Sequence, residues 1–571
     1  MERCKTSASI FKKRVFYSSL SVSVLQLCFL FVLLCLTHFD PWNPLEWLTS
    51  ALVKFVSLRI WGCFAGIVCV TAVQCYSYSK NFVNESKFAV NRFAQLRTFF
   101  SLNYWLLLNL HMVVWGIMSW MIMELFEKNL IDAEDKCLSE NRVVLLASGV
   151  WFGGYFLIFD CRNVQKPTPR YLQFPVIHQL KFLQVKMSLF PLFQRSVVDA
   201  VSLTLVFFAF YIWKGNTLRE IVYEYGLANN EWCKDTSYSV LSISTILLTW
   251  FFSSIYFYTV YIMKLLFRVF LTEHHKFPVT APFSSGSLLT IHEALLSSNP
   301  VIMQLGYLDL RVLAEKDLSR RSELFTLSHL GGHPHNWNAV VETALKMICE
   351  FTGRLRMAVS DEPKLVASAC KTELKENNTK LEVGSPYRYT LRSLVTSGSE
   401  PTTLNPINMT VLAPVPEDTL LDIVARHVKG AFTQLLEKPV ICYFFGDRME
   451  LNVHHVLSHA QPVMWAADGL SLLAASSIVT DKYGVALKDL PALITALLDL
   501  KQVLDRLHKM STFKKELRSY QEDVKMRLSL QALVKRSLYR ITIAFQHHIN
   551  ELPLSSGVKG QLKPFILFKE G

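Results

Sequence analysis

The longest uncharged stretch of the chain is the feature that most restricts its fold. Residues Tyr238–Met263 contain no Asp, Glu, Lys or Arg, and Lys264 follows immediately. As an α-helix rising about 1.5 Å per residue, this stretch is longer than the roughly 30 Å of a bilayer's hydrocarbon core. We therefore predict that it crosses a membrane. No run of comparable apolar character follows it.

Five further apolar runs precede this stretch, so the sequence predicts six transmembrane helices. They lie at about residues 16–39, 60–78, 99–123, 143–159, 197–213 and 238–263. The fourth and fifth runs are close to the lower length limit for a spanning helix. Trp and Tyr residues stand near several ends, as in the interfacial belts of membrane proteins. Residues 1–270 are therefore predicted to form a six-span helical bundle.

The charges of the loops predict the orientation of this bundle. The N-terminus and the second and fourth loops are rich in Lys and Arg, whereas the third loop is acidic. By the positive-inside rule, the N-terminus, the even loops and the whole C-terminal half face the cytosol. Topology also explains the net charge of +13 better than nucleic-acid binding does, because the basic residues cluster beside the spans.

Two cysteines are the only ones in the predicted lumenal loops. Cys137 lies in the third loop and Cys233 in the fifth, so both would face a compartment that permits disulfides. A bridge between them and two free thiols are both consistent with this placement. Alkylation of both thiols without prior reduction would exclude the bridge.

Two pairs of glycines four residues apart lie within predicted spans. Gly62 and Gly66 belong to the second span, and Gly149 and Gly153 belong to the fourth. Glycines at this spacing let two helix backbones approach closely. We therefore predict a tightly packed bundle.

The fourth loop contains an amphipathic pattern between Pro175 and Pro191. Its apolar residues recur at steps of four and three, and most polar residues fall on other faces. They are Val176, Leu180, Leu183, Met187 and Phe190. One hypothesis is a helix lying in the membrane surface, and the other is a helix packed on the cytosolic domain.

The chain after the last span has the pattern of a helical, water-exposed domain. A linker is predicted within residues 271–287, and residues 288–571 are predicted to form a mainly α-helical cytosolic domain with its own core. Polar and charged residues dominate 364–416, which predicts a mobile insertion. A seam of leucines predicts contact with a partner helix, inside the chain or outside it. It comprises Leu493, Leu497, Leu500, Leu504 and Leu507. The predicted fold class is all-α.

The sequence contains no recognisable active site. It lacks the phosphate-binding, dinucleotide-binding and nucleophile-elbow motifs. His329, His333 and His335 lie close together, but no Cys or carboxylate stands at ligand spacing, so a shaped loop is favoured over a metal site. His455 and His459 share a helix face without the H-E-x-x-H pattern. We therefore predict no enzyme activity, no cofactor and no metal.

Four segments after the last span resemble one known family. They are Leu288–Leu295, Leu305–Leu310, Ser319–Ser328 and Gly331–Trp337, the last with the sequence Gly-Gly-His-Pro-His-Asn-Trp. Together with six spans and a helical C-terminal half, they resemble the nuclear division cycle transmembrane nucleoporins, ring proteins of the nuclear pore membrane. The resemblance covers essentially the whole chain.

This resemblance implies a non-enzymatic function. A protein of this family would anchor nuclear pore complexes in the nuclear envelope and support their assembly. The implied partners are membrane lipids, the nucleoporin aladin, the inner-ring linker nucleoporin and other pore-membrane proteins, without direct contact to nucleic acid. Synthesis at the endoplasmic reticulum and cytosolic termini would follow.

The resemblance also singles out one motif for a structural or partner-binding role. Its residues are Arg320, Arg321, Phe325, Gly331, Gly332, His333, Pro334, His335, Asn336 and Trp337. We expect the arginine pair to clamp neighbouring helices and the two glycines to turn the chain, in preference to direct partner contact.

Two other functions remain open at the level of sequence. One is a multipass endoplasmic reticulum transporter or channel with a cytosolic regulatory domain, which would need a polar path through the spans. The other is a membrane-embedded lipid enzyme, for which His111 is the only candidate side chain. A punctate nuclear rim in cells would separate the anchor from both.

Overall fold

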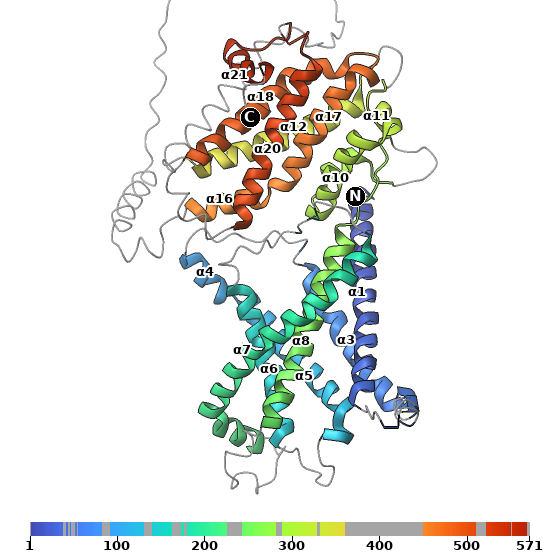
Figure 1. Ribbon diagram of the computed structural model, residues 1–571, viewed down its shortest axis with the longest axis vertical. Coiled ribbons are helices and arrows are strands. Elements are labelled where there is room, and N and C mark those ends of the chain that lie inside the picture. The colour runs from blue at the N-terminus through green and yellow to red at the C-terminus, as the bar shows by residue number, and fades with distance from the viewer. Residues whose placement is uncertain are drawn as a thin grey trace, which may run out of the picture.

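The architecture is that of two helical bundles stacked end to end (Figure 1). In the computed structural model, every regular element within the described residues is an α-helix. These residues are 2–37, 55–80, 92–130, 140–162, 180–224, 243–280, 288–327, 332–359, 449–509, 521–549 and 551–567, with isolated residues between them. The predicted all-α fold class is therefore confirmed.

The first bundle contains all six predicted spans. Its helices are α1 (Glu2–Thr37), α3 (Leu58–Lys80), α4 (Arg92–Phe99), α5 (Leu102–Leu130), α6 (Glu140–Arg162), α7 (Lys181–Glu224) and α8 (Ile243–Leu271). Five of them are long and apolar enough to cross a bilayer, and α6 has a shorter apolar core, Val143–Tyr155. The short α4 packs against α5 and was not predicted.

The close approach of α5 and α6 depends on the second glycine pair. A Cβ atom placed on Gly149 would lie 2.6 Å from the Ser119 Cβ, and one on Gly153 would lie 2.7 Å from the His111 carbonyl oxygen. The Ser119 hydroxyl also donates to the Leu145 carbonyl at 2.9 Å. The first pair differs, because nothing lies within 4 Å of such an atom on Gly62. Only the fourth-span pair therefore joins two backbones.

Helix α7 joins two segments that the sequence analysis treats separately. It begins at Lys181 and continues through Pro191 into the predicted fifth span. Proline lacks an N–H and removes one helical hydrogen bond, but the ladder on either side persists. Helix α7 packs against α8, where Trp250 Nε1 donates to the Val197 carbonyl at 3.1 Å. Residues 181–191 are thus part of α7 and not a separate helix, and contact of the predicted apolar face with the membrane surface stays a prediction.

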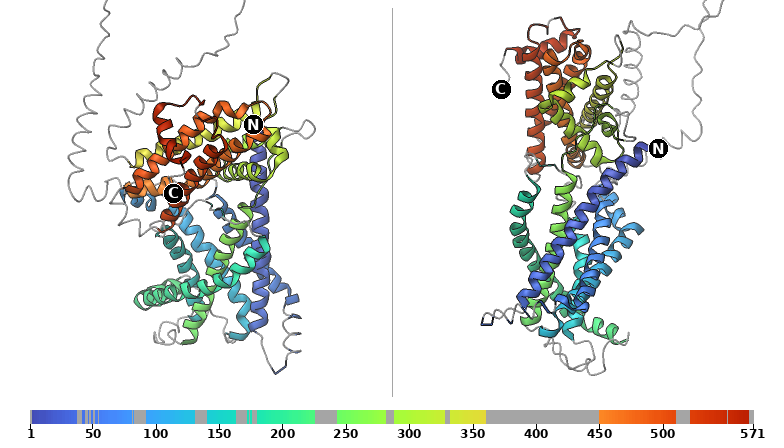
Figure 2. Two further views of the ribbon diagram at one scale, coloured as in Figure 1. Left: turned by 45° about the horizontal axis from the view of Figure 1, so that its top comes forward. Right: turned by 90° about the vertical axis from the view of Figure 1, so that its right-hand side faces the viewer.

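The second bundle sits on one end of the membrane helices, as two further views show (Figure 2). Its helices are α9 (Ile291–Leu295), α10 (Pro300–Lys316), α11 (Leu318–Leu324), α12 (His335–Val359), α16 (Met449–Ser458), α17 (Ala460–Thr480), α18 (Val485–Lys509), α20 (Gln521–Ala544) and α21 (Ser556–Ile566). Polar caps define where they begin: Thr290 and Glu293 form a capping box on α9, and Asn299 caps α10 ahead of Pro300. The predicted insertion at 364–416 lies outside the described residues.

Helix α17 is the centre of this second bundle. By length and composition it could cross a membrane, yet it packs against α10, α12 and α20. A helix that is apolar on all sides is buried, and here the burial is inside protein. The predicted leucine seam of α18 is buried as well, so within the described residues its partner helices are α12 and α20 of the same chain.

Replacement of Gly149 by Leu tests the packing of α5 on α6. We expect Gly149→Leu to destabilise the membrane bundle by about 1–3 kcal/mol, because the new side chain overpacks a backbone contact. The measurement is the melting temperature of the full-length protein in mild detergent. Gly62→Leu is the matched control and should leave this temperature unchanged. Equal effects of the two substitutions would contradict the assignment.

Candidate functional site: the junction of the two bundles

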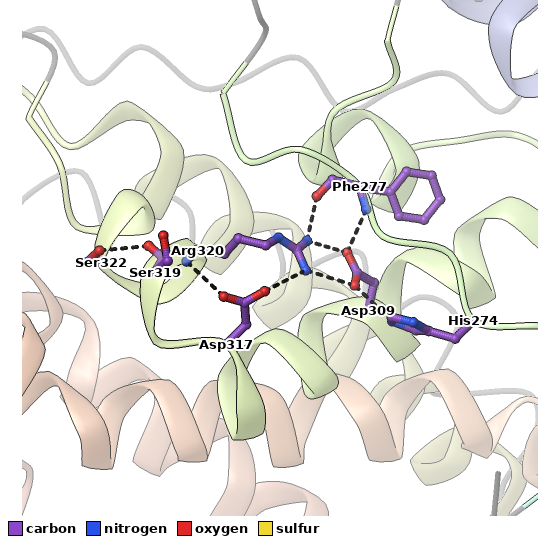
Figure 3. A network of polar contacts seen from close by, with 7 residues as sticks. All are labelled: His274, Phe277, Asp309, Asp317, Ser319, Arg320 and Ser322. Carbon is purple, nitrogen blue, oxygen red and sulfur yellow. Dashed lines mark hydrogen bonds and ion pairs between the residues drawn. The ribbon is translucent and has the colours of Figure 1, made fainter.

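A buried carboxylate marks the point where the chain passes from the membrane bundle to the second bundle. Asp309 lies in the apolar run of α10, and its side chain is 0% exposed. Arg320 of α11 binds it with both ends of the guanidinium, Nη1 to Oδ1 at 3.1 Å and Nη2 to Oδ2 at 2.5 Å (Figure 3). A two-point arginine–carboxylate pair of this kind fixes orientation as well as distance.

The same carboxylate holds the segment that follows α8. The Phe277 backbone N–H donates to Asp309 Oδ2 at 3.0 Å, and His274 Nε2 lies 3.0 Å from Oδ1. Arg320 Nη2 also donates to the Phe277 carbonyl at 2.5 Å (Figure 3). Burial alone would raise the pKa of Asp309, but the hydrogen bonds from His274 and Arg320 outweigh it and hold that pKa below its ordinary value. The acid is therefore charged, and it ties the last membrane helix to α10 and α11.

The end of α8 is capped by the first helix of the chain. Arg14 is buried, and its Nη1 donates to the carbonyls of Phe270, Leu271 and Glu273 at 3.2, 3.1 and 2.7 Å. A cation at a helix C-terminus satisfies carbonyl groups that have no partner within the helix. Arg14 thereby binds α1 to the exit of α8. The sequence analysis treats Arg14 only as one of the basic residues that orient the N-terminus.

A segment of the fourth loop provides a further attachment. The backbone of Phe174 exchanges two hydrogen bonds with the Gln461 side chain, N–H to Oε1 at 3.2 Å and Nε2–H to the carbonyl at 3.1 Å. Its ring packs edge-on against Trp465, with the centroids 5.1 Å apart. Both partners belong to α17, so the loop between α6 and α7 is pinned to the central helix of the second bundle.

A second buried acid holds the second bundle together. The side chain of Asp468 on α17 is 3% exposed. Arg311 Nε of α10 donates to its Oδ2 at 2.9 Å. Arg540 Nη1 of α20 donates to its Oδ1 at 2.9 Å and to Ser471 Oγ at 2.6 Å. Arg536 adds an ion pair at 3.8 Å. Helices α10 and α20 are therefore both fastened to α17.

Several residues of the predicted motif point inward. Phe325 and Trp337 are buried, and their ring centroids lie 4.9 Å apart. Trp337 Nε1 donates to Asp489 Oδ2 at 2.9 Å, which links α12 to α18. Arg320, Phe325 and Trp337 of the motif thus contact neighbouring elements inside the protein, and the clamping role of the motif stays a prediction.

The remaining predicted residues are spread over other environments. Arg321, Gly332, Pro334 and Asn336 are partly buried, whereas His333 and His335 are exposed. Leu180, Leu183, Met187 and Phe190 are exposed on and just before α7. Gly331, Cys137, Cys233 and Val176 lie outside the described residues. The exposed histidines thus leave partner contact open for one part of the motif.

The described residues offer no cluster of three or more metal-binding side chains. The rings of His455 and His459 meet edge to face, with their centroids 5.0 Å apart. Burial, followed by the nearby charges of His459, His454 and Arg354, lowers the pKa of His455 to about 4. His455 therefore stays largely neutral in the folded protein at physiological pH.

The sequence analysis missed Asp309, Asp468 and Gln461. The first two carried a usable signal, because each is a lone acid within an apolar helical run, and such a residue is buried only with a cationic partner. Gln461 carried none, since its role is to bind a backbone far away in the chain.

Comparison with known proteins decides the family. The family model described as "Nucleoporin protein Ndc1-Nup" matches residues 9–563. The chain belongs to this family. Similar relatives include "Nucleoporin NDC1" of Mus musculus, 27% identical over 524 residues that cover 77% of each chain. The protein of that name in Homo sapiens is 28% identical over 523 residues, again 77% of each chain. That of Xenopus laevis is 25% identical and covers 95% of this chain and 96% of its own.

Membership of the Ndc1 family confirms the resemblance that the motif segments carry. It makes the chain a nucleoporin, which is a structural component of the nuclear pore and not an enzyme. The apolar helices of the first bundle make it a transmembrane nucleoporin of the nuclear envelope. The junction is thus a structural site, in which charged groups join two bundles.

Removal of the Asp309 charge tests the junction of this nucleoporin. We expect Asp309→Asn to destabilise the protein by about 3 kcal/mol, because it removes the two-point ion pair of the buried Arg320 and leaves only the longer contact with Asp317 at 4.0 Å. Thermal unfolding of the full-length protein in detergent measures the effect. Glu551→Gln removes an exposed acid paired with His548 and serves as the control, with a change below about 1 kcal/mol. An Asp309→Asn variant that unfolds at the wild-type temperature would show that the cluster is dispensable for stability.

The low pKa of His455 predicts a pH dependence of stability. The folded state binds a proton on His455 less tightly than the unfolded chain does, because histidines of an unfolded chain titrate at about pH 6.5. The stability that the neutral His455 ring contributes is therefore fully present above about pH 6.5 and is lost as the pH falls toward 4. Melting temperatures between about pH 7 and 5 should decline less steeply for His455→Gln than for the wild type. The exposed His548→Gln should keep the wild-type slope, and an unchanged slope in His455→Gln would refute the assignment.

Proposed function

We propose that this nucleoporin anchors the nuclear pore complex in the nuclear envelope and recruits soluble nucleoporins through its second bundle. The observation that carries the proposal is the junction. Buried contacts of Asp309 and Phe174 fasten the second bundle to the segment after α8 and to the fourth loop, and Arg14 holds α1 on the end of α8. A subunit bound to the second bundle is then held by the bilayer itself.

The membrane helices suit such an anchor. Spanning helices hold a protein in the bilayer far more firmly than an interfacial helix or a lipid chain does. A rigid junction adds a defined orientation, because the second bundle presents the same faces to the aqueous phase in every copy. Support for pore assembly would follow from positioning alone, without a chemical step.

We further propose that both chain termini face the cytosol or the pore. The positive loops support this orientation, and so does Arg14, which places the start of α1 beside the end of α8. The start of α1 also lies close to α10 (Figure 1). Protection of a C-terminal epitope from protease in intact microsomes would contradict it.

The family resemblance points to particular partners and to an origin. We propose aladin, the inner-ring linker nucleoporin and other pore-membrane proteins as partners, and synthesis at the endoplasmic reticulum. Loss of all these proteins from a purified complex that retains pore function would overturn this part of the proposal.

A double substitution that weakens the junction tests the proposed function. Arg14→Met with Phe174→Ala removes the Arg14 cap on the end of α8 and the contact of the Phe174 ring with Trp465, and it leaves the residues of the second bundle intact. In cells without the endogenous protein, we expect this variant to reach the nuclear envelope but to retain less soluble nucleoporin there. Quantitative imaging and affinity purification of the tagged full-length protein measure both.

The matched control exchanges the same residue types at exposed positions. Lys13 and Phe16 lie on the exposed face of α1. Lys13→Met with Phe16→Ala should therefore behave as the wild type, with a punctate nuclear rim. Diffuse endoplasmic reticulum staining of the wild type would refute the proposed anchor. Full recruitment of soluble nucleoporins by the Arg14→Met, Phe174→Ala variant would refute the role of the junction.

A further inference from the structure

Three arginines converge on one carboxylate in the second bundle. Arg311 of α10 and Arg540 of α20 each donate to Asp468 of α17 at 2.9 Å. Arg536 of α20 forms an ion pair with the same acid at 3.8 Å. We name these four residues the α17 arginine cluster. Three guanidinium groups against one carboxylate leave an excess of two positive charges, which the charge of the acid does not explain.

The other acids of these helices do not remove the excess. Asp468 is the only acid of α17, and residues 524–549 of α20 contain none. On α10, Asp309 belongs to the junction. Glu315 is exposed and forms no ion pair with Arg311 within the described residues, so water screens its charge. The cluster is therefore positively charged in the folded protein.

The arginines keep hydrogen-bond donors for a ligand. In the part of the chain that the structure describes, Arg311 donates through Nε alone, and Arg540 donates through Nη1 alone. Arg536 has only its longer ion pair there. The three side chains are 34%, 25% and 59% exposed in the order given, so a ligand can reach them from solvent.

The cluster is ordered before any ligand binds. The bond from Nε to Asp468 Oδ2 holds Arg311, and Arg540 Nη1 is held by Asp468 Oδ1 and by Ser471 Oγ at 2.6 Å. Side chains that are already fixed lose less conformational freedom when they bind. Asp468 is thus the base of the cluster, and Arg536 is its most exposed member.

The excess charge matches a phosphate monoester. Such a group carries about −1.5 to −2 charges at neutral pH and several strong acceptor oxygens. The planar guanidinium group binds phosphate through paired hydrogen bonds. A carboxylate would compensate only one of the two excess charges. The number and type of the arginines therefore favour phosphate over Asp or Glu as the ligand.

The surroundings of the cluster favour a protein ligand over a lipid headgroup. Ile543 follows Arg540 by three residues, lies on the same face of α20 and is 55% exposed. It offers an apolar contact for a residue next to the phosphate. Figure 1 shows α17 and α20 within the second bundle, beyond the end of the membrane helices. A peptide can reach both the cluster and this side chain from the aqueous phase.

We propose that the α17 arginine cluster binds a phosphorylated serine or threonine of a soluble protein. Arg536 would make the principal contact with the phosphate, and Arg311 and Arg540 would complete its hydrogen bonds from the two helices that flank α17. The proposal rests on the recruitment of soluble nucleoporins proposed above and assigns one site and one chemical group to it.

Peptide binding to the full-length protein in mild detergent tests this site. The probe is a degenerate peptide mixture with phosphoserine at its centre, compared with the same mixture carrying serine or glutamate there. We expect the phosphoserine mixture to bind about tenfold or more tightly than either, and to raise the melting temperature of the protein. Arg536→Gln should weaken this binding by about tenfold, because it removes a charged donor.

The matched control is Arg356→Gln, which replaces an exposed arginine on α12. It should keep the wild-type affinity for the phosphoserine mixture. Without peptide, Arg536→Gln should keep the wild-type melting temperature, since that side chain is 59% exposed and makes one long ion pair. A lower melting temperature would assign Arg536 to the fold instead of the site.

Four results would overturn the proposal. The serine mixture or the glutamate mixture could bind as tightly as the phosphoserine mixture, which would exclude recognition of phosphate. Unchanged binding by Arg536→Gln would place the peptide elsewhere. Glycerol phosphate, the headgroup of phosphatidic acid without its acyl chains, could bind as tightly as the peptides, which would favour lipid or free phosphate over a protein.

The outcome is separable from that of the proposed anchor. A wild-type protein that fails to form the punctate nuclear rim refutes the anchor, whichever peptide it binds. A wild-type rim together with no preference for phosphoserine refutes only the arginine cluster as a binding site.

Discussion

The arrangement of the two bundles depends on one buried charge, the Asp309 carboxylate, which needs charged and hydrogen-bonding partners. A buried carboxylate is costly unless it is paired and hydrogen-bonded. Asp309 meets that requirement with Arg320, His274 and the Phe277 N–H, and these groups come from α11 and from the segment after α8. Satisfying one acid therefore sets the positions of three chain segments, and the first helices of the second bundle are fixed on the last membrane helix.

A similar principle explains how one helix avoids the membrane. By length and apolarity α17 is as suited to a bilayer as several helices of the first bundle. Asp468 distinguishes it, because a charge in the middle of a lipid-embedded helix is unfavourable. Arg311 and Arg540 compensate that charge only when α10 and α20 lie alongside. The polar pairing thus makes α17 a core helix of protein, and the surrounding apolar residues supply most of the buried surface.

The sequence was sufficient for what depends on local pattern. Spans follow from runs of apolar residues, and the buried face of α18 follows from the leucine seam. The continuity of α7 through Pro191 was missed, because packing along α8 outweighs the local preference of proline to end a helix. A pattern of side chains within one segment does not reveal how neighbouring helices support it.

The candidate site was less accessible to sequence reasoning, because its contacts join residues that are distant in the chain. Arg14 and Leu271 are 257 positions apart, and Phe174 and Gln461 are 287 apart. The motif around Arg320 was recognised by resemblance, but its carboxylate partner was not. Asp309 and Asp468 show what could be used in such chains: a lone acid in an apolar helix implies an arginine on a neighbouring element.

The junction also explains how the membrane bundle can fix the position of the second bundle. Two attachments of different chemistry, a buried ion pair and a pair of backbone hydrogen bonds, hold the second bundle on one end of the membrane bundle, and the Arg14 cap holds α1 on the end of α8. The surfaces left exposed then divide by setting: apolar faces of α1 and α7 suit lipid, whereas the second bundle shows mainly polar residues.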